Sequence, residues 1–489
     1  MISIPANSTT DTLGTGFDSF ACAQRGSGRI WLGGDYLFSS ARISYRDPGE
    51  TTWTANGYST IVAGSATPLD RPSMAIGNLP VELGGAPVLY MMFNGGAGSS
   101  TTQCDGSNVH WVSIADSLPP SSFWPAPVRM NPRDVAPNSG TCKYSGWANQ
   151  PVVLDDGTVV VASTDWNNVY VNGKRPYVIR YQYDDDVPED PKMSWWPYDG
   201  AGVRIGLNYN PEIQATQVHS ATGTVGDTAF GIDNRTCNPS IAVDYSKSPN
   251  WVYVAFYARS APGNPEAEPQ DLNTDLYLAL SKDGGVTFDN DDIFHITDEM
   301  LLGGSGNILA TGPDQVMPAI AVDCAGGLSI VYYCNRNDFA GSYATGYYDV
   351  YYAHVTGMGG APSIDLQQRF TGVSFPNGTH SSPMAFLGHY HYLAPAGPDG
   401  QTIYAAYIIR EFDSTAQAWK RNCYVRRISA RSCVADLNLN SEADPNDFDA
   451  FVDSYLDESP SADLNLDATI DGADVDLFVE AYDELGGGG

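Results

Sequence analysis

Short apolar and aromatic runs, separated by turn-forming residues, follow one another along most of the chain. A proline that opens an alternation of small and apolar residues recurs five times, at Pro72, Pro151, Pro239, Pro318 and Pro383. Each is followed by an apolar, tyrosine-rich run such as 251–259 and then by a third run such as 274–281. Alternating runs of this length, bounded by Gly, Pro, Asn and Asp, predict β-strands.

The repeated unit therefore contains three strands and a variable segment that follows them. Residues 25–47 form a degenerate sixth unit. A small antiparallel sheet cannot bury two apolar faces alone, so such units pack radially around an axis. The pattern predicts an all-β, six-bladed β-propeller over residues 17–430, with seven blades as the rival count.

The end of the chain has a different periodicity. Apolar residues fall at helical spacing in two short stretches, namely Phe448, Phe451, Val452, Tyr455 and Leu456, and then Val475, Phe478, Val479 and Tyr482. This spacing predicts two amphipathic helices and a small α-helical domain over 434–485. Residues 1–16 form an N-terminal extension before the propeller, and residues 486–489 form a glycine tail after the helices.

Each predicted helix is preceded by a 12-residue acidic loop, Asp436 to Asp447 and Asp463 to Asp474. Oxygen donors stand at loop positions 1, 3, 5, 9 and 12, and the backbone carbonyl of position 7 adds one more. These residues are Asp436, Asn438, Asn440, Glu442, Asp444 and Asp447 in the first loop, and Asp463, Asn465, Asp467, Thr469, Asp471 and Asp474 in the second. Since Ca²⁺ takes six to eight oxygen ligands, the spacing predicts two calcium ions.

Charge supports cation binding and argues against nucleic acid. The formal net charge is −32, and residues 434–489 contain acidic residues but no Lys or Arg. Such a chain repels phosphate backbones. Acidic loops at 183–191 and 288–294 offer further calcium sites, with solvated turns as the plainer alternative.

Composition also bears on the compartment. No apolar run approaches the roughly 20 residues of a membrane-spanning helix. Eight cysteines without a CxxC spacing suit disulfides outside the cytosol, although buried thiols are the alternative. Residues 1–16 lack the features of a secretory signal, so either the numbering begins after cleavage or secretion does not use that route. An extracellular or cell-surface location is expected.

Two motifs resemble known families. The residues Ser281, Asp283, Gly285, Thr287 and Phe288 in "SKDGGVTF" resemble the Asp-box of sialidases and other bacterial neuraminidase repeat proteins. The resemblance implies a sialidase-like β-propeller in which this turn is structural and lies on the periphery.

The two acidic loops, each followed by one helix, resemble the EF-hand-type loops of the dockerin module. The resemblance implies a calcium-dependent adaptor with a cohesin-like protein partner or copies of the chain itself. Ser441 and Ala468 depart from it, because they occupy the position where a glycine would ease the turn.

Enzymatic activity stays open. A sialidase requires three arginines, a tyrosine polarised by a glutamate and an acid/base aspartate, and Arg410 with Glu411 is the best fragment of that set, with a surface ion pair as the alternative. His389 and His391 share a strand face and could clasp a metal, although packed or surface histidines are the simpler interpretation.

We therefore expect an extracellular, non-catalytic β-propeller that acts as a structural or adhesive component of a cell-surface or filamentous assembly. Its dockerin-like module would attach it in the presence of calcium, and glycans are a further class of partner. The alternative is a secreted sialidase-like glycoside hydrolase that is anchored through the same module.

Overall fold

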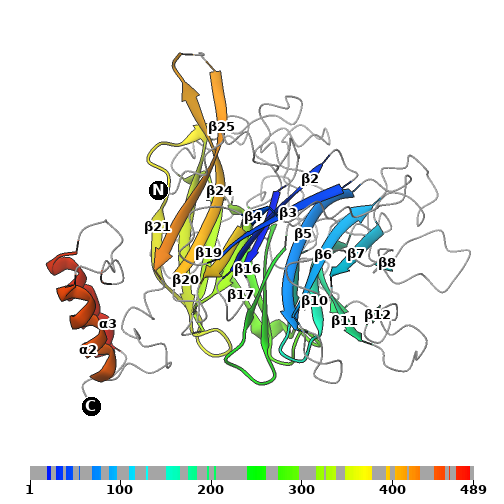
Figure 1. Ribbon diagram of the computed structural model, residues 1–489, viewed down its shortest axis with the longest axis horizontal. Helices are drawn as coiled ribbons and strands as arrows, with labels where there is room; N and C mark the ends of the chain where they lie inside the picture. Colours follow the sequence, from blue (N-terminus) through cyan, green and yellow to red (C-terminus); the bar gives the residue numbers. More distant parts are fainter. Residues whose placement is uncertain are drawn as a thin grey trace, which may run out of the picture.

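The structure is a computed structural model, and its described residues are mostly in β-strands (Figure 1). The described residues are 19–23, 29–36, 40–47, 54–55, 69–78, 87–95, 109–115, 128–129, 150–165, 175–183, 195–197, 203–204, 239–259, 274–296, 315–323, 326–336, 347–376, 392–396, 402–415, 418–429, 445–457, 462 and 470–484.

The described strands form antiparallel sheets in chain order. The first sheet is β1 (Ser19–Ala23), β2 (Ile30–Tyr36), β3 (Ser40–Arg46) and β4 (Thr54–Ala55), and the second is β5 (Leu69–Asn78), β6 (Pro87–Gly95), β7 (Val109–Ala115) and β8 (Val128–Arg129). The third is β9 (Gln150–Val153), β10 (Val159–Asp165), β11 (Arg175–Tyr183), β12 (Trp195–Pro197) and β13 (Val203–Arg204).

Three more sheets follow. The fourth is β14 (Ser240–Asp244), β15 (Trp251–Arg259), β16 (Thr274–Ser281) and β17 (Ile293–Ile296), with the short 3-10 helix η4 (Asn290–Asp292) before its last strand. The fifth is β18 (Gln315–Val322), β19 (Leu328–Cys334), β20 (Tyr347–Thr356), β21 (Ser363–Arg369) and β22 (Phe375–Pro376). The sixth is β23 (Tyr392–Ala396), β24 (Thr402–Asp413) and β25 (Ala418–Ser429).

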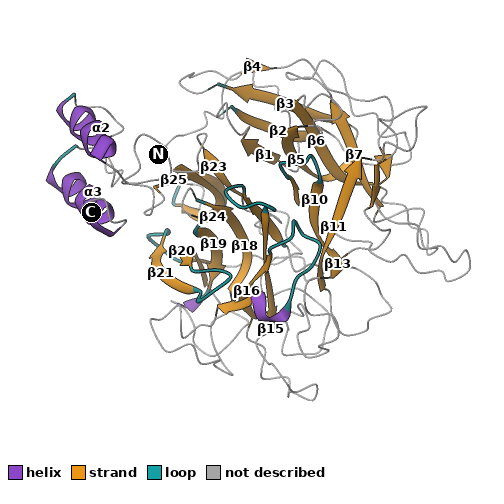
Figure 2. Ribbon diagram, turned by 90° about the horizontal axis from the view of Figure 1, so that it is seen from below, coloured by secondary structure: helices purple, strands orange, loops and turns teal. Residues whose placement is uncertain are grey.

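The first strands of consecutive sheets are neighbours in space. β1 lies next to β5, β5 next to β9, β9 next to β14, β14 next to β18 and β18 next to β23. β23 in turn lies next to β1, so the six first strands follow one another around a circle. Figure 2 shows the sheets fanning outward from these strands. This radial arrangement is that of a β-propeller.

Three of the repeated prolines, Pro72, Pro151 and Pro318, lie in these first strands, Pro239 comes just before β14, and Pro383 lies outside the described residues. Pro72 and Pro318 lie at register shifts in β5 and β18, where the chain bulges between Asp70 and Ser73 and between Val316 and Ala319. Each first strand is the end of its own sheet, so a residue without an N–H is tolerated there. A bulge therefore accommodates proline in β5 and β18, whereas Pro151 pairs in regular register with Val161.

The core lies between sheets. Every residue of β18 and β19 is buried, and so are most residues of β20. The middle of the fifth sheet is therefore covered on both faces. One apolar cluster joins the fourth, fifth and sixth sheets through residues such as Leu278, Ile330 and Ile403, and another joins the third and fourth through Val160 and Val254. A sheet of this kind is stable only between two neighbours.

Two helices lie beside the β body, α2 (Pro445–Leu456) and α3 (Gly472–Glu484) (Figures 1 and 2). They coincide with the two helices predicted from the apolar spacing. Neither they nor any other helix among the described residues is long and apolar enough to cross a membrane. The predicted tail 486–489 and extension 1–16 lie outside the described residues.

Gly77 of β5 lies against the third sheet, and its replacement by Ala should destabilise the body. A Cβ at this position would lie 2.3 Å from Cβ of Val153 in the third sheet, too close for any real pair of carbons. We expect Gly77→Ala to lower the free energy of unfolding by about 1–3 kcal/mol, measured by denaturant unfolding.

Gly372→Ala is the matched control, because an added Cβ there meets nothing within 4 Å. Equal midpoints for Gly77→Ala and the unsubstituted chain would show that the second and third sheets do not approach each other in this way.

Candidate functional site

The turn after β16 has the hydrogen bonds expected of an Asp-box. Asp283 Oδ1 accepts bonds from the Ser281 hydroxyl at 2.6 Å, the Val286 N–H at 3.0 Å and the Thr287 N–H at 2.9 Å. Its Oδ2 accepts the Thr287 hydroxyl at 2.6 Å, while the Gly285 N–H donates to Ser281 Oγ at 2.7 Å. The carboxylate therefore accepts hydrogen bonds from backbone N–H groups that have no backbone carbonyl partner in the turn.

These bonds also set the ionisation of Asp283. Partial burial alone would raise the pKa of its carboxyl group, but the hydrogen bonds from Ser281, Thr287 and Val286 outweigh burial and lower the pKa below 3.8. A lowered pKa in the folded state means that the stabilisation is present above pH 3.8 and disappears as the pH falls through the folded-state pKa.

The Asp-box packs against the preceding sheet. Gly284 and Gly285 have positive φ values of 73° and 84°, which favour glycine. A Cβ on Gly285 would lie 3.2 Å from Val160 and 3.6 Å from Val178 of the third sheet. Phe288 is buried in the cluster that joins the third and fourth sheets. The motif lies at the turn between the third and fourth strands of its sheet and contacts the preceding sheet.

Asn250 links three turns on this side of the body. Its side-chain oxygen accepts the N–H of Asp155 at 2.9 Å, and its amide donates to Asp155 Oδ2 at 2.9 Å. Its backbone carbonyl accepts the N–H of Gly284 at 3.1 Å. The turn after β9, the turn before β15 and the Asp-box are thus joined through one buried amide.

A second polar network crosses the fifth sheet. His354 of β20 contacts Asp323, just after β18, through Nε2 at 2.8 Å, and Asp365 of β21 through Nδ1 at 2.7 Å. His354 and Asp323 are buried, whereas Asp365 is exposed. Burial alone would lower the pKa of His354, but the bonds to the two aspartates prevail and raise the pKa to about 9. The imidazole is therefore a cation at neutral pH.

Sequence reasoning missed His354, although a signal was present. His354 and Asp349 are the two ionisable residues other than tyrosine in the apolar and aromatic sequence of β20, and Asp323 follows "IAV" as Asp244 does in the fourth sheet. Gly327 makes room for the ring, because a Cβ there would lie 2.5 Å from Nε2 of His354. The histidines considered for metal binding, His389 and His391, lie outside the described residues.

Another buried carboxylate lies at the opposite end of the fifth sheet. Asp349 accepts bonds from Arg369 Nη2 at 2.7 Å, the Thr371 hydroxyl at 2.7 Å and the Ser374 hydroxyl at 2.9 Å. Three donors, one of which is the Arg369 cation, compensate the buried carboxylate. It fixes the segment between β21 and β22, which is a structural role.

Arg410 and Glu411 do not pair with each other in the structure. Arg410 donates to the backbone carbonyl of Pro376 at 3.2 Å, whereas Glu411 accepts short hydrogen bonds from Tyr424 and Asn422. The bond to Glu411 raises the pKa of Tyr424, so its hydroxyl stays protonated at neutral pH. These residues lie on β24 and β25, outside the circle of first strands.

The closing residues of both acidic loops are buried at the start of the helices. Asp447 lies in the first turn of α2 and Asp474 in the first turn of α3, and each is 0% exposed. Asp474 Oδ2 accepts the N–H of Asp471 at 2.9 Å, and Asp471 Oδ1 accepts the N–H of Ala473 at 2.8 Å. These bonds cap the second helix.

The remaining predicted ligands cannot be placed. Asp436, Asn438, Asn440, Glu442, Asp444, Asp463, Asn465, Asp467 and Thr469 lie outside the described residues. Of the acidic loops in the β body, 288–294 contains η4, where Asp292 pairs with Lys282 at 2.7 Å, whereas 184–191 lies outside the described residues. Among the described residues, no group of three or more His, Cys, Asp or Glu side chains could hold a metal ion.

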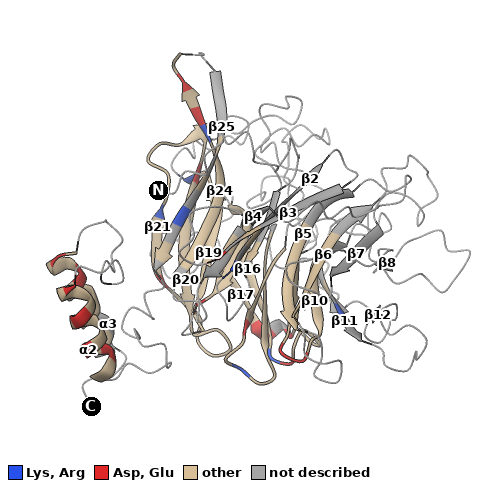
Figure 3. Cartoon of the chain, viewed as in Figure 1, with Lys and Arg blue, Asp and Glu red and all other residues tan. Residues whose placement is uncertain are grey.

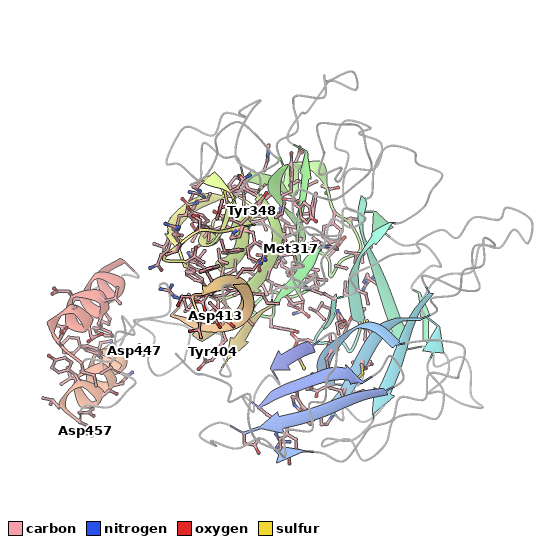
Figure 4. All side chains as sticks on the ribbon, turned by 90° about the horizontal axis from the view of Figure 1, so that it is seen from above. Met317, Tyr348, Tyr404, Asp413, Asp447 and Asp457 are labelled. Carbon is pink, nitrogen blue, oxygen red and sulfur yellow. The ribbon has the colours of Figure 1, made fainter. Side chains whose placement is uncertain are left out.

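The helices pack through equivalent residues. The rings of Phe451 and Phe478, 27 positions apart by their numbers, stack with centroids 4.3 Å apart and planes 2° from parallel. Tyr455 and Tyr482, which are separated by the same interval, flank this stack at 5.9 and 5.6 Å. Figure 4 shows Asp447 and Asp457 at the two ends of α2, beside the body. The sequence repeat is therefore also a repeat of contacts.

No protein-family model and no curated protein matches the chain. Among solved structures, the α-L-arabinofuranosidase of Fusarium graminearum with arabinobiose matches at 11% identity and a TM-score of 0.46, over 84% of this chain and 92% of that one. Trypanosoma rangeli sialidase matches at 12% identity and a TM-score of 0.43, over 90% of this chain and 57% of that one. Aleuria aurantia lectin with a fucosylated GlcNAc matches at 11% identity and a TM-score of 0.37, over 83% of this chain and 94% of that one.

Removal of the Asp-box carboxylate should weaken the contact between two sheets. Asp283→Ala loses four hydrogen bonds, so we expect a loss of about 2 kcal/mol in the free energy of unfolding. Asp289→Ala, an exposed carboxylate just beyond the same turn, is the control and should change stability little. Equal losses in both variants would contradict an architectural role for the motif.

The network around His354 should make stability depend on alkaline pH. The pKa of the folded state lies above the ordinary value of 6.5, so the stabilisation is complete below pH 6.5 and is lost as the pH rises through about 9. His354→Gln should flatten the fall in the free energy of unfolding over this range, measured by urea denaturation at several pH values. A variant that keeps the same slope would assign the alkaline loss to other groups.

Proposed function

We propose that the chain is an extracellular building block: a six-bladed β-propeller attached to an assembly through a calcium-dependent, dockerin-like module. The six sheets with described strands and the circle of first strands support the blade count. The Asp-box of the fourth sheet supports the sialidase-like class of repeat, since its turn has the bonds and the inter-sheet contacts of an architectural motif.

The burial of Asp447 and Asp474 is the observation that carries the calcium proposal. A carboxylate removed from water needs a compensating cation or several hydrogen bonds. Hydrogen bonds supply part of this compensation, as the N–H of Asp471 does for Asp474, but residues 434–489 contain no Lys or Arg that would add a positive charge. A calcium ion in each loop would supply it, with Asp447 and Asp474 as the closing ligands.

The module is suited to attachment rather than catalysis. Its core is small, with Phe451, Ala462 and Phe478 as its buried apolar residues among those described. Such a core gains much of its stability from a bound ion, so calcium would couple folding of the module to its surroundings. A cohesin-like protein or another copy of the chain would then bind the folded module, and glycans remain a further class of partner.

A second candidate is a secreted sialidase-like glycoside hydrolase with the same anchor. The contact of Tyr424 with Glu411 favours it, because such enzymes use a tyrosine polarised by a glutamate. Its place on β24 and β25 and its raised pKa favour a structural contact instead. Release of 4-methylumbelliferone from sialoside and arabinofuranoside conjugates, abolished in Tyr424→Phe, would establish the hydrolase.

Calcium binding to the full chain should depend on the two buried aspartates. We expect titration calorimetry to give two ions per chain, and Asp447→Asn or Asp474→Asn to weaken one ion each by about tenfold or more. Asp449→Asn, an exposed carboxylate of α2, is the control and should retain both ions.

Hydrogen exchange provides the second measurement. Chelation should remove protection from 445–457 and 470–484 first and leave the β body protected, because blade packing does not require the ion. Absence of calcium uptake, or protection of both helices that is indifferent to chelator, would overturn the attachment proposal.

A further inference from the structure

The sixth sheet differs from the others at its outer edge. Five sheets continue past the third strand to at least one more, whereas among the described strands β25 pairs only with β24. The strand has 12 residues, so the edge that faces away from β24 is roughly 40 Å long. The edge of a sheet is a template for association with a further segment.

This edge is also basic in a strongly acidic chain. β25 contains Lys420, Arg421, Arg426 and Arg427 and no acidic residue, although acids outnumber bases 57 to 25 in the whole sequence. The guanidinium of Arg426 lies 4.2 Å above the ring of Phe370 of the neighbouring sheet, which orients it against the body. A basic edge selects an acidic partner.

The C-terminal helices present an acidic stripe that calcium binding does not explain. Asp449, Asp453 and Asp457 are exposed and four residues apart, so they share one face of α2. Asp476, Glu480 and Glu484 stand at the equivalent positions of the second repeat. None of the six is a predicted ligand, and Figure 3 shows the acidic residues along both helices.

The stripe has a cost within the module. Like charges at a spacing of four residues destabilise a helix by about 0.2–0.5 kcal/mol per pair. Asp453 and Asp457 lie near the C-terminal end of α2, where the helix dipole also disfavours negative charge, and its last turn has no basic residue. A pattern that costs stability and recurs in both helices indicates a basic partner surface.

We propose that the acidic helices of one copy of the chain dock on the β24–β25 hairpin of a second copy, which links chains head to tail. This inference rests on the proposed calcium-dependent module. The exposed apolar side chains of the helices, Phe448, Leu456 and Val479, would be covered in the same contact. So would Phe412 near the tip of the hairpin, which is 50% exposed.

The occupant is a second copy because the module of the same chain leaves the hairpin uncovered. Figures 1, 2 and 4 show α2 and α3 clear of the sheets. A head-to-tail contact joins two different surfaces, so it builds a ring or an open chain of subunits rather than a closed pair.

Sedimentation of the full chain in saturating calcium tests the proposal. We expect the average mass to rise with protein concentration and to fall when NaCl is raised from about 50 to about 500 mM, because screening weakens contacts between surface charges. Lys420→Glu/Arg421→Glu should weaken self-association by at least about tenfold. Lys247→Glu/Lys282→Glu is the control. It changes the net charge by the same amount, but on turns of the fourth sheet, and should leave self-association unchanged.

Charge exchange makes the test specific to the two surfaces. Asp449→Lys/Asp453→Lys should also weaken association, and one chain with both sets of substitutions should regain it, since the attraction is restored with the signs reversed. A chain that binds calcium yet stays monomeric, or whose association ignores both sets of substitutions, would overturn the docking and leave the calcium module intact. Calcium uptake measured on the same samples separates these failures, because its absence would overturn both proposals.

Discussion

The apolar character of both sheet faces is the constraint on which the β body depends. The middle strands of the fifth sheet are buried throughout, so this sheet has no face that water could cover. Stability must come from contacts between sheets, and the apolar clusters accordingly cross sheet boundaries. A circle of sheets meets this requirement for every member, whereas an open row would expose two apolar faces at its ends.

Polar residues in such a body serve mainly at the turns where two sheets meet. Asp283 organises a turn whose glycines lie against the third sheet, and Asn250 ties that turn to two others. His354 instead links the two sides of a single sheet. One ring nitrogen contacts Asp323 after the first strand, and the other contacts Asp365 of the outer strand. These buried groups are fully paired, which is how polar atoms are retained in an apolar interior without a large penalty. Their arrangement is architectural.

Much of this could be predicted from sequence because the signals were local. The proline-led strand repeat, the Asp-box and the two helices each depend on residues close together in the chain, and the structure has strands and helices at those places. The His354 network could not be predicted, because Asp323, His354 and Asp365 meet only through the order of strands in the sheet. Arg410 and Glu411 show the converse: they are adjacent in sequence, yet alternate strand faces give them different partners.

The distribution of charge links the two parts of the chain. The module concentrates acidic residues, and some of them are its predicted calcium ligands. The exposed carboxylates along α2 are additional to those ligands. The body concentrates basic residues on its last strand, which is also the strand without an outer neighbour among those described. Calcium would neutralise the loops and leave the helix stripe charged, so folding of the module and recognition by its partner would use different carboxylates. An assembly built in this way would respond to calcium through the fold of the module and to ionic strength through its contact surface.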